Sequence, residues 1–281
     1  METTKAVAKT GIGKPDLATI VGLIVALGCI MGGLLFEGGK IGDVVQFTAA
    51  MIVMGGTCGA VMVATPLRVL IGAAKRLLGV FFDPSVSFTE LIEQLVAYAT
   101  KARKGGLVGL EEDAQATPDV FLQKALMLAV DGTDLQELRK MLEIDMAITE
   151  HRGEAEAKVF ESAGGFAPTI GIIGAVLGLI QVMKNLANID EVGHGIAVSF
   201  VATVYGVGAA NLLFLPAATK IKARINLETQ RQEIILEAIS AIIEGLNPKL
   251  IRAKLEVYAH GEPVKAKPKE EKAPAESPAG A

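Results

Sequence analysis

Four long stretches of the chain contain no Asp, Glu, Lys or Arg, and they constrain the fold more than any other feature of the sequence. They hold 94 of the 281 residues and are, in chain order, residues 17–36, 44–67, 162–183 and 192–219. Each stretch is long enough to span a membrane, because roughly 20 apolar residues in a helix cross about 30 Å of hydrocarbon. All 58 charged residues lie in the other 187 positions. The sequence therefore predicts an all-α, polytopic membrane protein with four transmembrane helices and a helical cytoplasmic domain.

This segregation of charge disfavours a secreted enzyme, a nucleic-acid-binding domain, a disulfide scaffold and a disordered chain. The first stretch is also too long for a cleavable signal, whose apolar part has about 7–15 residues. Cys29 and Cys58 both fall inside predicted spans, where we expect no structural disulfide. The sequence contains no zinc spacing, nucleophile motif or phosphate-binding loop, so we expect neither an enzyme nor a cofactor.

The orientation in the membrane is predicted from the basic residues beside the spans. Those on one side are Lys5, Lys9 and Lys14 before span 1, Arg68, Lys75 and Arg76 after span 2, and Lys220, Lys222 and Arg224 after span 4. The two short hairpin loops on the other side offer only Lys40 and Lys184. Because basic loops remain in the cytoplasm, we expect both termini and the long central segment to be cytoplasmic.

The chain is predicted to have six parts. They are a cytoplasmic N-tail (1–16), a first transmembrane hairpin (17–66), a helical cytoplasmic domain (67–161), a second transmembrane hairpin (162–219), a cytoplasmic helix (220–260) and a disordered tail (261–281). Capping boxes at Ser87 and Asp134 predict two helix starts, and Pro118 is expected in the first turn of another helix. The helix that leaves span 4 is predicted to continue to Asn247.

The two hairpins differ in composition. Spans 1 and 2 have glycines four residues apart, Gly28 with Gly32 and Gly55 with Gly59, a spacing typical of close helix packing. Span 3 has a proline near its cytoplasmic end and a smooth face of three glycines. Span 4 carries the polar side chains Ser199, Thr203, Tyr205 and Asn211. Each of these could line a hydrated path, or bond to its own helix or bridge to a neighbour.

None of the four spans contains a carboxylate or a basic side chain. Proteins that move protons or cations through a bilayer usually keep an ionisable group near mid-membrane. Either this chain has no ion path, or the titrating group arrives on another chain.

Three segments resemble the MotA/TolQ/ExbB proton-channel family, and within it the A-subunits of the flagellar motor stator. They are Ala167 to Ile180 in span 3, Gly195 to Gly208 with Leu215-Pro216 in span 4, and Ala102 to Glu111 in the cytoplasmic segment. With the order of the spans, the resemblance covers residues 17 to about 255.

The resemblance implies a homo-oligomeric ring in the bacterial inner membrane, with five A-subunits around the single spans of two MotB-like B-subunits. The B-subunit span would bring the missing aspartate. Pro168 and Pro216 match prolines that couple proton passage to movement, and Thr203 matches a threonine in the pore-facing part of span 4. Ala175 falls where sodium-driven relatives tend to carry threonine. An alanine methyl offers no oxygen ligand to sodium, so we expect a proton-driven unit with hairpin 162–219 lining the pore.

Arg103 and Glu111 match the charged pair that the family uses against the rotor protein FliG, with Lys104 and Glu112 as supporting charges. A turn at Gly105-Gly106 would display a basic helix end and an acidic helix start on one exposed tip. The alternative is that these charges only compensate two helix dipoles.

The function expected from the resemblance is that of a flagellar stator subunit, which forms a proton channel with its B-type partner and converts ion flow into torque. One alternative is a TolQ/ExbB-like proton-driven energiser of an envelope complex, although those chains normally begin with a single span. A second alternative is a membrane scaffold without transport, in which the glycines only pack.

Overall fold

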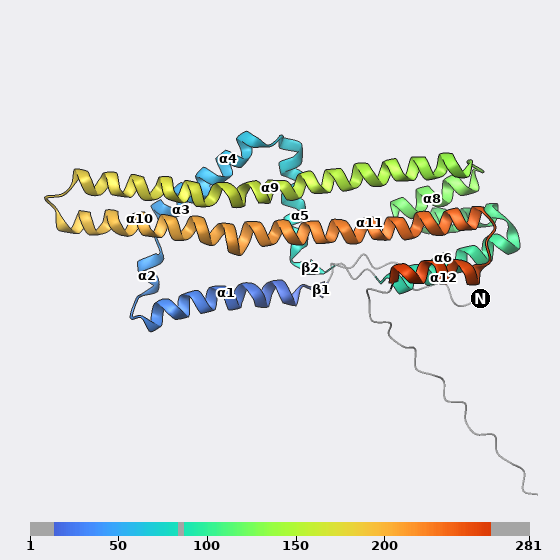
Figure 1. Ribbon diagram of the computed structural model, residues 1–281, viewed down its shortest axis with the longest axis horizontal. Helices are drawn as coiled ribbons and strands as arrows, with labels where there is room; N and C mark the ends of the chain where they lie inside the picture. The colour runs from blue at the N-terminus through green and yellow to red at the C-terminus, as the bar shows by residue number, and fades with distance from the viewer. Residues whose placement is uncertain (1–13, 84–86, 260–281) are drawn as a thin grey trace, which may run out of the picture.

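The structure is a computed structural model that describes residues 14–83 and 87–259, and almost all of these are helical (Figure 1). The helical stretches long and apolar enough to cross a membrane are Leu17–Phe36, Ile41–Ala64, Leu135–Lys184 and Ile189–Ile243. The predicted all-α fold with four transmembrane helices is therefore confirmed. The predicted tail 261–281, like Lys5 and Lys9, lies outside the described residues.

The centre of the fold is one long antiparallel hairpin. Its first arm is α9 (Leu135–Lys184), whose 50 residues extend over about 75 Å at a rise of 1.5 Å per residue. Its second arm joins α10 (Ile189–Ala209), the π-helical turn η3 (Ala210–Phe214) and α11 (Leu215–Ile243) without a break. Figure 1 shows the two arms side by side along their length. One helix was expected to run from the Asp134 cap towards span 3, and α9 does so.

Span 2 is less regular than one predicted helix. It consists of α2 (Ile41–Val44), α3 (Phe47–Ala50), a second π-helical turn η1 (Met51–Gly55) and α4 (Gly56–Ala64). Extended backbone at Val45 and Gln46 separates α2 from α3. The span ends at Ala64 because Thr65 precedes a proline and adopts the extended conformation that this position favours.

Helix α5 (Leu67–Val80) crosses the hairpin where span 2 ends, and it contacts both α9 and α11 (Figure 1). Ala73 and Val80 bury their side chains against a cluster that includes Ala157, Ile221 and Ile225. The helix is therefore bound to both arms at the boundary between the charge-free and charged halves of the molecule.

A buried carboxylate fixes α5 to α9. The side chain of Glu156 is 5% exposed and forms ion pairs with Arg76 of α5 and, at 3.3 Å, with Arg152 one turn earlier on α9. A Cβ atom added at Gly72 would overlap the Glu156 carboxylate. The absence of a side chain at Gly72 thus lets the two helices approach closely enough for the ion pair to form.

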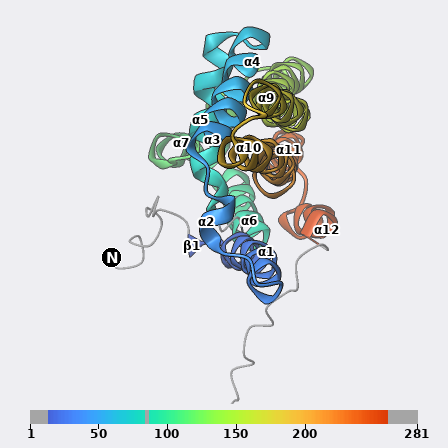
Figure 2. The ribbon, with the colours of Figure 1, turned by 90° about the vertical axis from the view of Figure 1, so that its left-hand side faces the viewer.

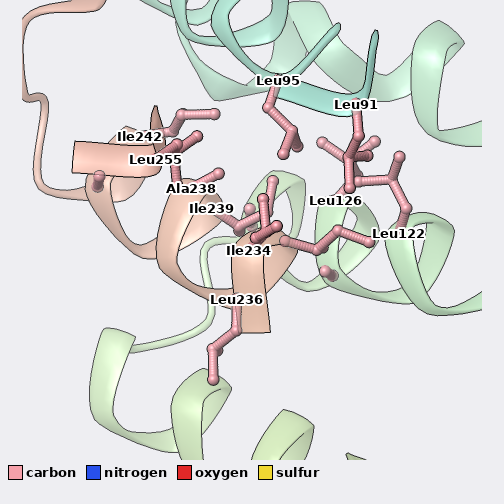
Figure 3. Close-up of a cluster of buried hydrophobic side chains, with 14 of the residues drawn as sticks. Leu91, Leu95, Leu122, Leu126, Ile234, Leu236, Ala238, Ile239, Ile242 and Leu255 are labelled. Carbon is pink, nitrogen blue, oxygen red and sulfur yellow. The ribbon is translucent and has the colours of Figure 1, made fainter. Parts of the chain in front are cut away.

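Beyond the membrane, shorter helices pack around the outer ends of the hairpin. They are α6 (Phe88–Gly105), the 3-10 turn η2 (Leu107–Leu110), α7 (Glu111–Ala116), α8 (Val120–Val130) and α12 (Pro248–Ala259). Figure 3 shows their shared core, in which Leu95, Leu126, Ile234, Ile239 and Leu255 are fully buried. The predicted capping box at Ser87 begins α6, with the Ser87 hydroxyl accepting from the Glu90 N–H.

Two predicted helix boundaries are wrong. Pro118 does not lie in a first helical turn, because Asp119 caps α8 by accepting from the N–H groups of Phe121 and Leu122. The helix that leaves span 4 ends at Ile243 and not at Asn247, and α12 (Pro248–Ala259) follows it within the part 220–260. Helix α11 ends at Ile243 because Gly245 adopts a positive φ of 73°, which glycine allows at a helix end.

Helix α1 (Leu17–Phe36) lies apart from α9 and α10 (Figures 1 and 2), and none of its residues is buried. At its basic end, the strand β1 (Lys14–Pro15) pairs with β2 (Phe82–Asp83) after α5. Asp16 caps α1 through the Thr19 N–H and forms an ion pair with Lys220 of α11. Polar contacts at one end therefore hold a span that has no buried side chain.

The glycine pairs predicted to pack in spans 1 and 2 have no such partner within the described chain. No heavy atom lies within 4 Å of a Cβ added at Gly28, Gly32, Gly55 or Gly59. Span 2 instead contacts span 3 through Gly56, where an added Cβ would lie 2.8 Å from the Ile170 side chain.

We expect Gly72→Ala to destabilise the protein, because the new methyl group displaces Glu156 from its two arginines. Overpacking of this kind costs about 1–3 kcal/mol. Gly79→Ala is the matched control on the same helix, since its Cβ would meet only Arg224, at an ordinary 3.5 Å. Thermal melting in detergent should show a lower Tm for Gly72→Ala alone. An equal effect of the two substitutions would contradict the role of Gly72 in allowing the ion pairs of Glu156.

Candidate functional site

The closest contact between membrane helices is a seam of glycines between α9 and α10. A Cβ added at Gly171 would lie 2.9 Å from the Ala202 carbonyl oxygen and 3.3 Å from the Cα of Gly206. Further along, a Cβ at Gly178 would lie 2.8 Å from the carbonyl oxygen of Gly195. The predicted smooth glycine face of span 3 is therefore turned towards span 4 of the same chain. It lets the two backbones touch, as small residues do in membrane helix pairs.

The polar side chains of span 4 are all hydrogen-bonded to backbone. The Ser199 hydroxyl donates to the carbonyls of Ala175 and Gly195, at 2.8 and 2.9 Å. The Thr203 hydroxyl donates to the Ser199 carbonyl at 3.2 Å, and the Asn211 amide donates to that of Val207 at 2.9 Å. The sequence left two possibilities open for these side chains: to line a hydrated path, or to bond to their own helix or a neighbouring one. Each of them forms a bond of the second kind.

Tyr205 joins span 4 to the start of span 2. Its hydroxyl donates to the Val44 carbonyl at 2.6 Å and accepts from the Gln46 N–H at 3.2 Å. These bonds satisfy backbone groups that the extended break between α2 and α3 leaves without helical partners. The hydroxyl thus holds the irregular end of span 2 against the central hairpin.

Three of the predicted pathway residues lie together along the seam. Ala175 and Thr203 are linked through Ser199, which bonds to the first by its hydroxyl and to the second by its carbonyl. Pro168 lies inside α9, directly after Ala167. The carbonyl oxygen of Ala167 contacts Gly206 of α10 so closely that a Cβ at Gly206 would overlap it. All three side chains are half-buried in the isolated chain.

Pro216 lies elsewhere. It is in the first turn of α11, directly after the π-helical turn η3, and its side chain is exposed towards a groove beside α1. A proline removes one backbone donor and a π-helical turn removes the regular i to i−4 bonding, and both are recognised places for a helix to bend. The structure therefore separates Pro216 from the seam and places it at a joint between the two halves of the second arm.

The four predicted rotor-contact residues gather at one end of the helical domain. Arg103 and Lys104 are in the last turn of α6, and Glu111 and Glu112 are in the first turn of α7. All four are exposed. Between them Gly106 takes a φ of 76°, so the predicted glycine turn and exposed tip are present.

An ion pair stabilises this tip. Lys101 of α6 and Asp113 of α7 are 2.7 Å apart. The hydrogen bond to Asp113 raises the pKa of Lys101, which favours the charged form of the lysine. This contact was not predicted from the sequence, although a lysine and an aspartate on the two sides of a glycine turn are compatible with such a pair.

Other structurally important polar residues were also missed. Glu156 lies in a charged segment of ordinary appearance, and nothing local indicates its burial. Thr57 of span 2 is 1% exposed, and its hydroxyl has no hydrogen-bond partner among the described residues. One hydroxyl in an otherwise apolar span gives no sequence signal of its orientation.

The chain matches two sequence families. Residues 20–106 match the family described as motility protein A N-terminal, and residues 113–234 match the MotA/TolQ/ExbB proton channel family. Motility protein A of Bacillus subtilis (strain 168) is 34% identical over 245 residues, which are 86% of this chain and 90% of the relative.

Two solved structures are similar over nearly the whole described chain. The C. jejuni MotAB structure superposes with a TM-score of 0.83 at 35% identity, covering 86% of this chain and 95% of the solved one. The flagellar MotAB stator complex from Bacillus subtilis superposes with a TM-score of 0.80 at 32% identity, covering 88% and 97%. Sequence and fold agree along both hairpins and the helical domain, and the chain belongs to the MotA/TolQ/ExbB proton channel family, on its motility protein A branch.

Proposed function

We propose that this chain is the A-subunit of a flagellar stator, and that with a MotB-like partner it forms a proton channel that converts ion flow into torque. The observation that carries the proposal is the glycine seam in a hairpin whose two spans contain no Asp, Glu, Lys or Arg. The seam builds a compact pair of helices, and the pair brings no carboxylate into the membrane. The solved relatives are MotAB complexes, which supports a B-type partner whose span supplies an aspartate.

The hairpin can carry movement from the membrane to the helical domain. Its arms are continuous helices, and the ends of both arms contribute to the core shown in Figure 3. Pro168 and the joint at η3 and Pro216 are the places where an arm can bend. Protonation of the partner's aspartate would change which face of the hairpin packs against it. One elementary charge crossing 100 mV provides about 2.3 kcal/mol for such a step.

The proposed channel conducts protons and not sodium. Position 175 offers an alanine methyl group, which supplies no oxygen. Sodium requires oxygen ligands, so this side chain contributes nothing to a sodium site. A proton held by the partner's carboxylate requires no such ligands.

We place both termini and the helical domain in the cytoplasm, with the protein in the bacterial inner membrane. The support is the positive-inside rule. Arg68, Arg76, Lys220 and Arg224 lie at the end of the spans that also carries the helical domain, where Arg76 and Arg224 contact neighbouring helices. Within the described residues 14–83 and 87–259, the lysines at the opposite end are Lys40 and Lys184.

A ring of A-subunits, five around two B-subunits, completes the proposed assembly. Exposed apolar side chains beyond the span support self-association. Met141, Ile144 and Ile148 of α9 are 37%, 51% and 62% exposed, and their i, i+3, i+7 spacing places them on one face. Outside the bilayer, such a face is typical of a protein interface.

The exposed tip is proposed to contact the rotor protein FliG through Arg103 and Glu111, supported by Lys104 and Glu112. Basic residues at the end of α6 and acidic residues at the start of α7 suit a partner surface with a complementary charge pattern. Contacts between exposed charges form quickly and weaken with salt, as repeated stepping requires.

Of the two other functions, the TolQ/ExbB-like energiser is disfavoured by the two-span hairpin at the start of the chain and by the match of residues 20–106 to motility protein A. A membrane scaffold without transport would contain the same glycine seam between α9 and α10. A direct measurement of transport therefore distinguishes it from a channel.

Proton uptake should appear only when the chain is co-expressed with a B-type partner that has an aspartate in its span. The expected result is acidification of cells or vesicles that persists without sodium, because the spans of the A-subunit contain no carboxylate of their own. The measurement is internal pH after an external acid pulse. Proton uptake by this chain alone, or the absence of uptake with the partner, would overturn the proposal that the two chains together form the channel.

Pro168→Leu and Thr203→Leu should each stop or strongly slow swimming while stators still assemble, since both residues lie along the seam. Thr219→Leu is the control, because its hydroxyl bonds to the Leu215 carbonyl at 3.0 Å in the same i to i−4 manner outside the seam. Torque is read from tethered cells and assembly from a fluorescent fusion. Full torque in both seam variants would remove these residues from the pathway.

Glu111→Lys should abolish rotation, and Arg103→Glu should do the same. Glu90→Lys is the control, because Glu90 is also an exposed first-turn glutamate, at the start of α6. If these glutamates only compensated helix dipoles, Glu111→Lys and Glu90→Lys would have equal small effects, about 0.3–1 kcal/mol in stability. Normal rotation with both tip reversals would exclude the tip as the rotor contact.

A further inference from the structure

A basic groove lies between the end of α6 and the start of α12. The two helices run side by side (Figure 1), and the groove between them has a volume of about 470 Å³. Arg103 and Lys104 line it from α6, and Lys249 and Arg252 line it from α12. No aspartate or glutamate is among the described residues that line it. Two separate helices therefore contribute positive charge to one groove.

Three of these four cations have no acidic partner within residues 14–83 and 87–259. Arg252 donates to both carboxylate oxygens of Glu93, at 2.6 Å each, and so binds α12 to α6. Arg103, Lys104 and Lys249 are exposed and form no ion pair with a described residue. Exposed cations of this kind attract a partner surface of opposite charge. The groove is therefore complementary to an acidic partner.

The wall that α12 contributes is held in place at its first turn. The side-chain oxygen of Asn247 accepts from the Lys249 N–H at 3.0 Å, and the Asn247 carbonyl accepts from the Ile251 N–H at 3.0 Å. The Ile251 side chain is fully buried in the core of the helical domain. Lys249 is thus presented from a fixed backbone, which lowers the entropic cost of forming a contact.

The groove and the acidic helix α7 lie on different sides of α6. Lys101 pairs with Asp113 of α7, whereas the preceding residue, Thr100, lines the groove. Consecutive residues point about 100° apart around a helix. The basic end of α6 at Arg103 and Lys104 therefore has α7 on one flank and α12 on the other. A partner that reaches these two residues can contact the groove as well.

We propose that this groove is a second part of the rotor-contact surface, and that it receives an acidic segment of the rotor protein whose carboxylates pair with Arg103, Lys104 and Lys249. The α6 wall extends over the eight residues from Val96 to Lys104, which is about 12 Å along a helix. This length matches about two helical turns or about four residues of extended chain. The inference rests on the proposed contact with FliG and adds α12 to it. Arg252 positions the wall through Glu93 and is not itself a contact.

The test measures the affinity for purified FliG of the full-length protein, co-expressed with its B-type partner and reconstituted in nanodiscs. Lys249→Glu should weaken binding about fivefold, because it replaces an attraction by a repulsion at one of three cations. Lys249→Arg keeps the charge and should bind as the wild type does. Thr100→Glu should also weaken binding, since it introduces a negative charge at the opposite wall. The Tm of each variant in detergent verifies that it is folded.

Lys140→Glu is the matched control. Lys140 is an exposed lysine of α9 that does not line the groove and forms no ion pair with a described residue. Its reversal changes the net charge by the same amount and should leave the affinity for FliG unchanged. Equal losses in Lys249→Glu and Lys140→Glu would indicate only long-range attraction and would overturn the groove as a docking site.

Arg103→Glu separates this inference from the proposed function. Loss of binding in Arg103→Glu, with normal binding in Lys249→Glu and Thr100→Glu, would overturn the groove and leave the contact at the tip. Normal binding in all three variants would overturn both.

Deletion of residues 261–281 tests a different occupant, because this tail contains four glutamates. The deletion should leave the affinity for FliG unchanged if the groove receives the rotor protein. Tighter binding of FliG after the deletion would assign the groove to the chain's own tail and would overturn the proposal.

Discussion

The contact of backbone against backbone at the glycine seam is the interaction on which the rest of the structure depends. In a bilayer, apolar side chains gain little by leaving lipid for protein, so helices associate through close packing and backbone contact. Gly171 with Gly206 and Gly178 with Gly195 remove the atoms that would keep α9 and α10 apart. The hairpin formed in this way has a defined register, and α5, span 2 and the helical domain are all attached to its two arms.

Charged contacts then secure the elements that apolar packing holds weakly. Two such contacts lie where the charge-free stretches end, since there a carboxylate can be buried against a basic side chain without entering the hydrocarbon. Glu156 fixes α5 in this way, and Asp16 with Lys220 holds α1. In both cases the pairs join segments far apart in the sequence, so each closes a long loop of chain. The attachment of span 1 combines the Asp16–Lys220 pair with the pairing of β1 and β2.

The sequence allowed the spans and the exposed tip to be predicted because both depend on local properties. Span length follows from a run without charge, and the tip follows from a basic helix end, a glycine turn and an acidic helix start. Long-range polar contacts had no such local pattern. Tyr205 bonds to Val44 across 161 positions, and Glu156 to Arg76 across 80. Pro118 misled the prediction because proline in a first turn and proline just before an aspartate cap have nearly the same local sequence. The roles of Pro168, Ala175, Thr203 and Pro216 in ion flow come from the family resemblance and stay predictions.

The π-helical turn η3 also determines where the second arm can change its length. A π-helical turn accommodates about one residue more than an α-helical turn, so residues 210–214 turn the chain through about the same angle as four α-helical residues at about 100° each. Removing a single residue there would leave a regular helix and would keep Pro216, Lys220 and the face of α11 directed towards their present neighbours. The same deletion within the regular part of α10 or α11 would rotate everything beyond it by about 100°. One-residue deletions among relatives should therefore be found at this turn more often than elsewhere in the arm.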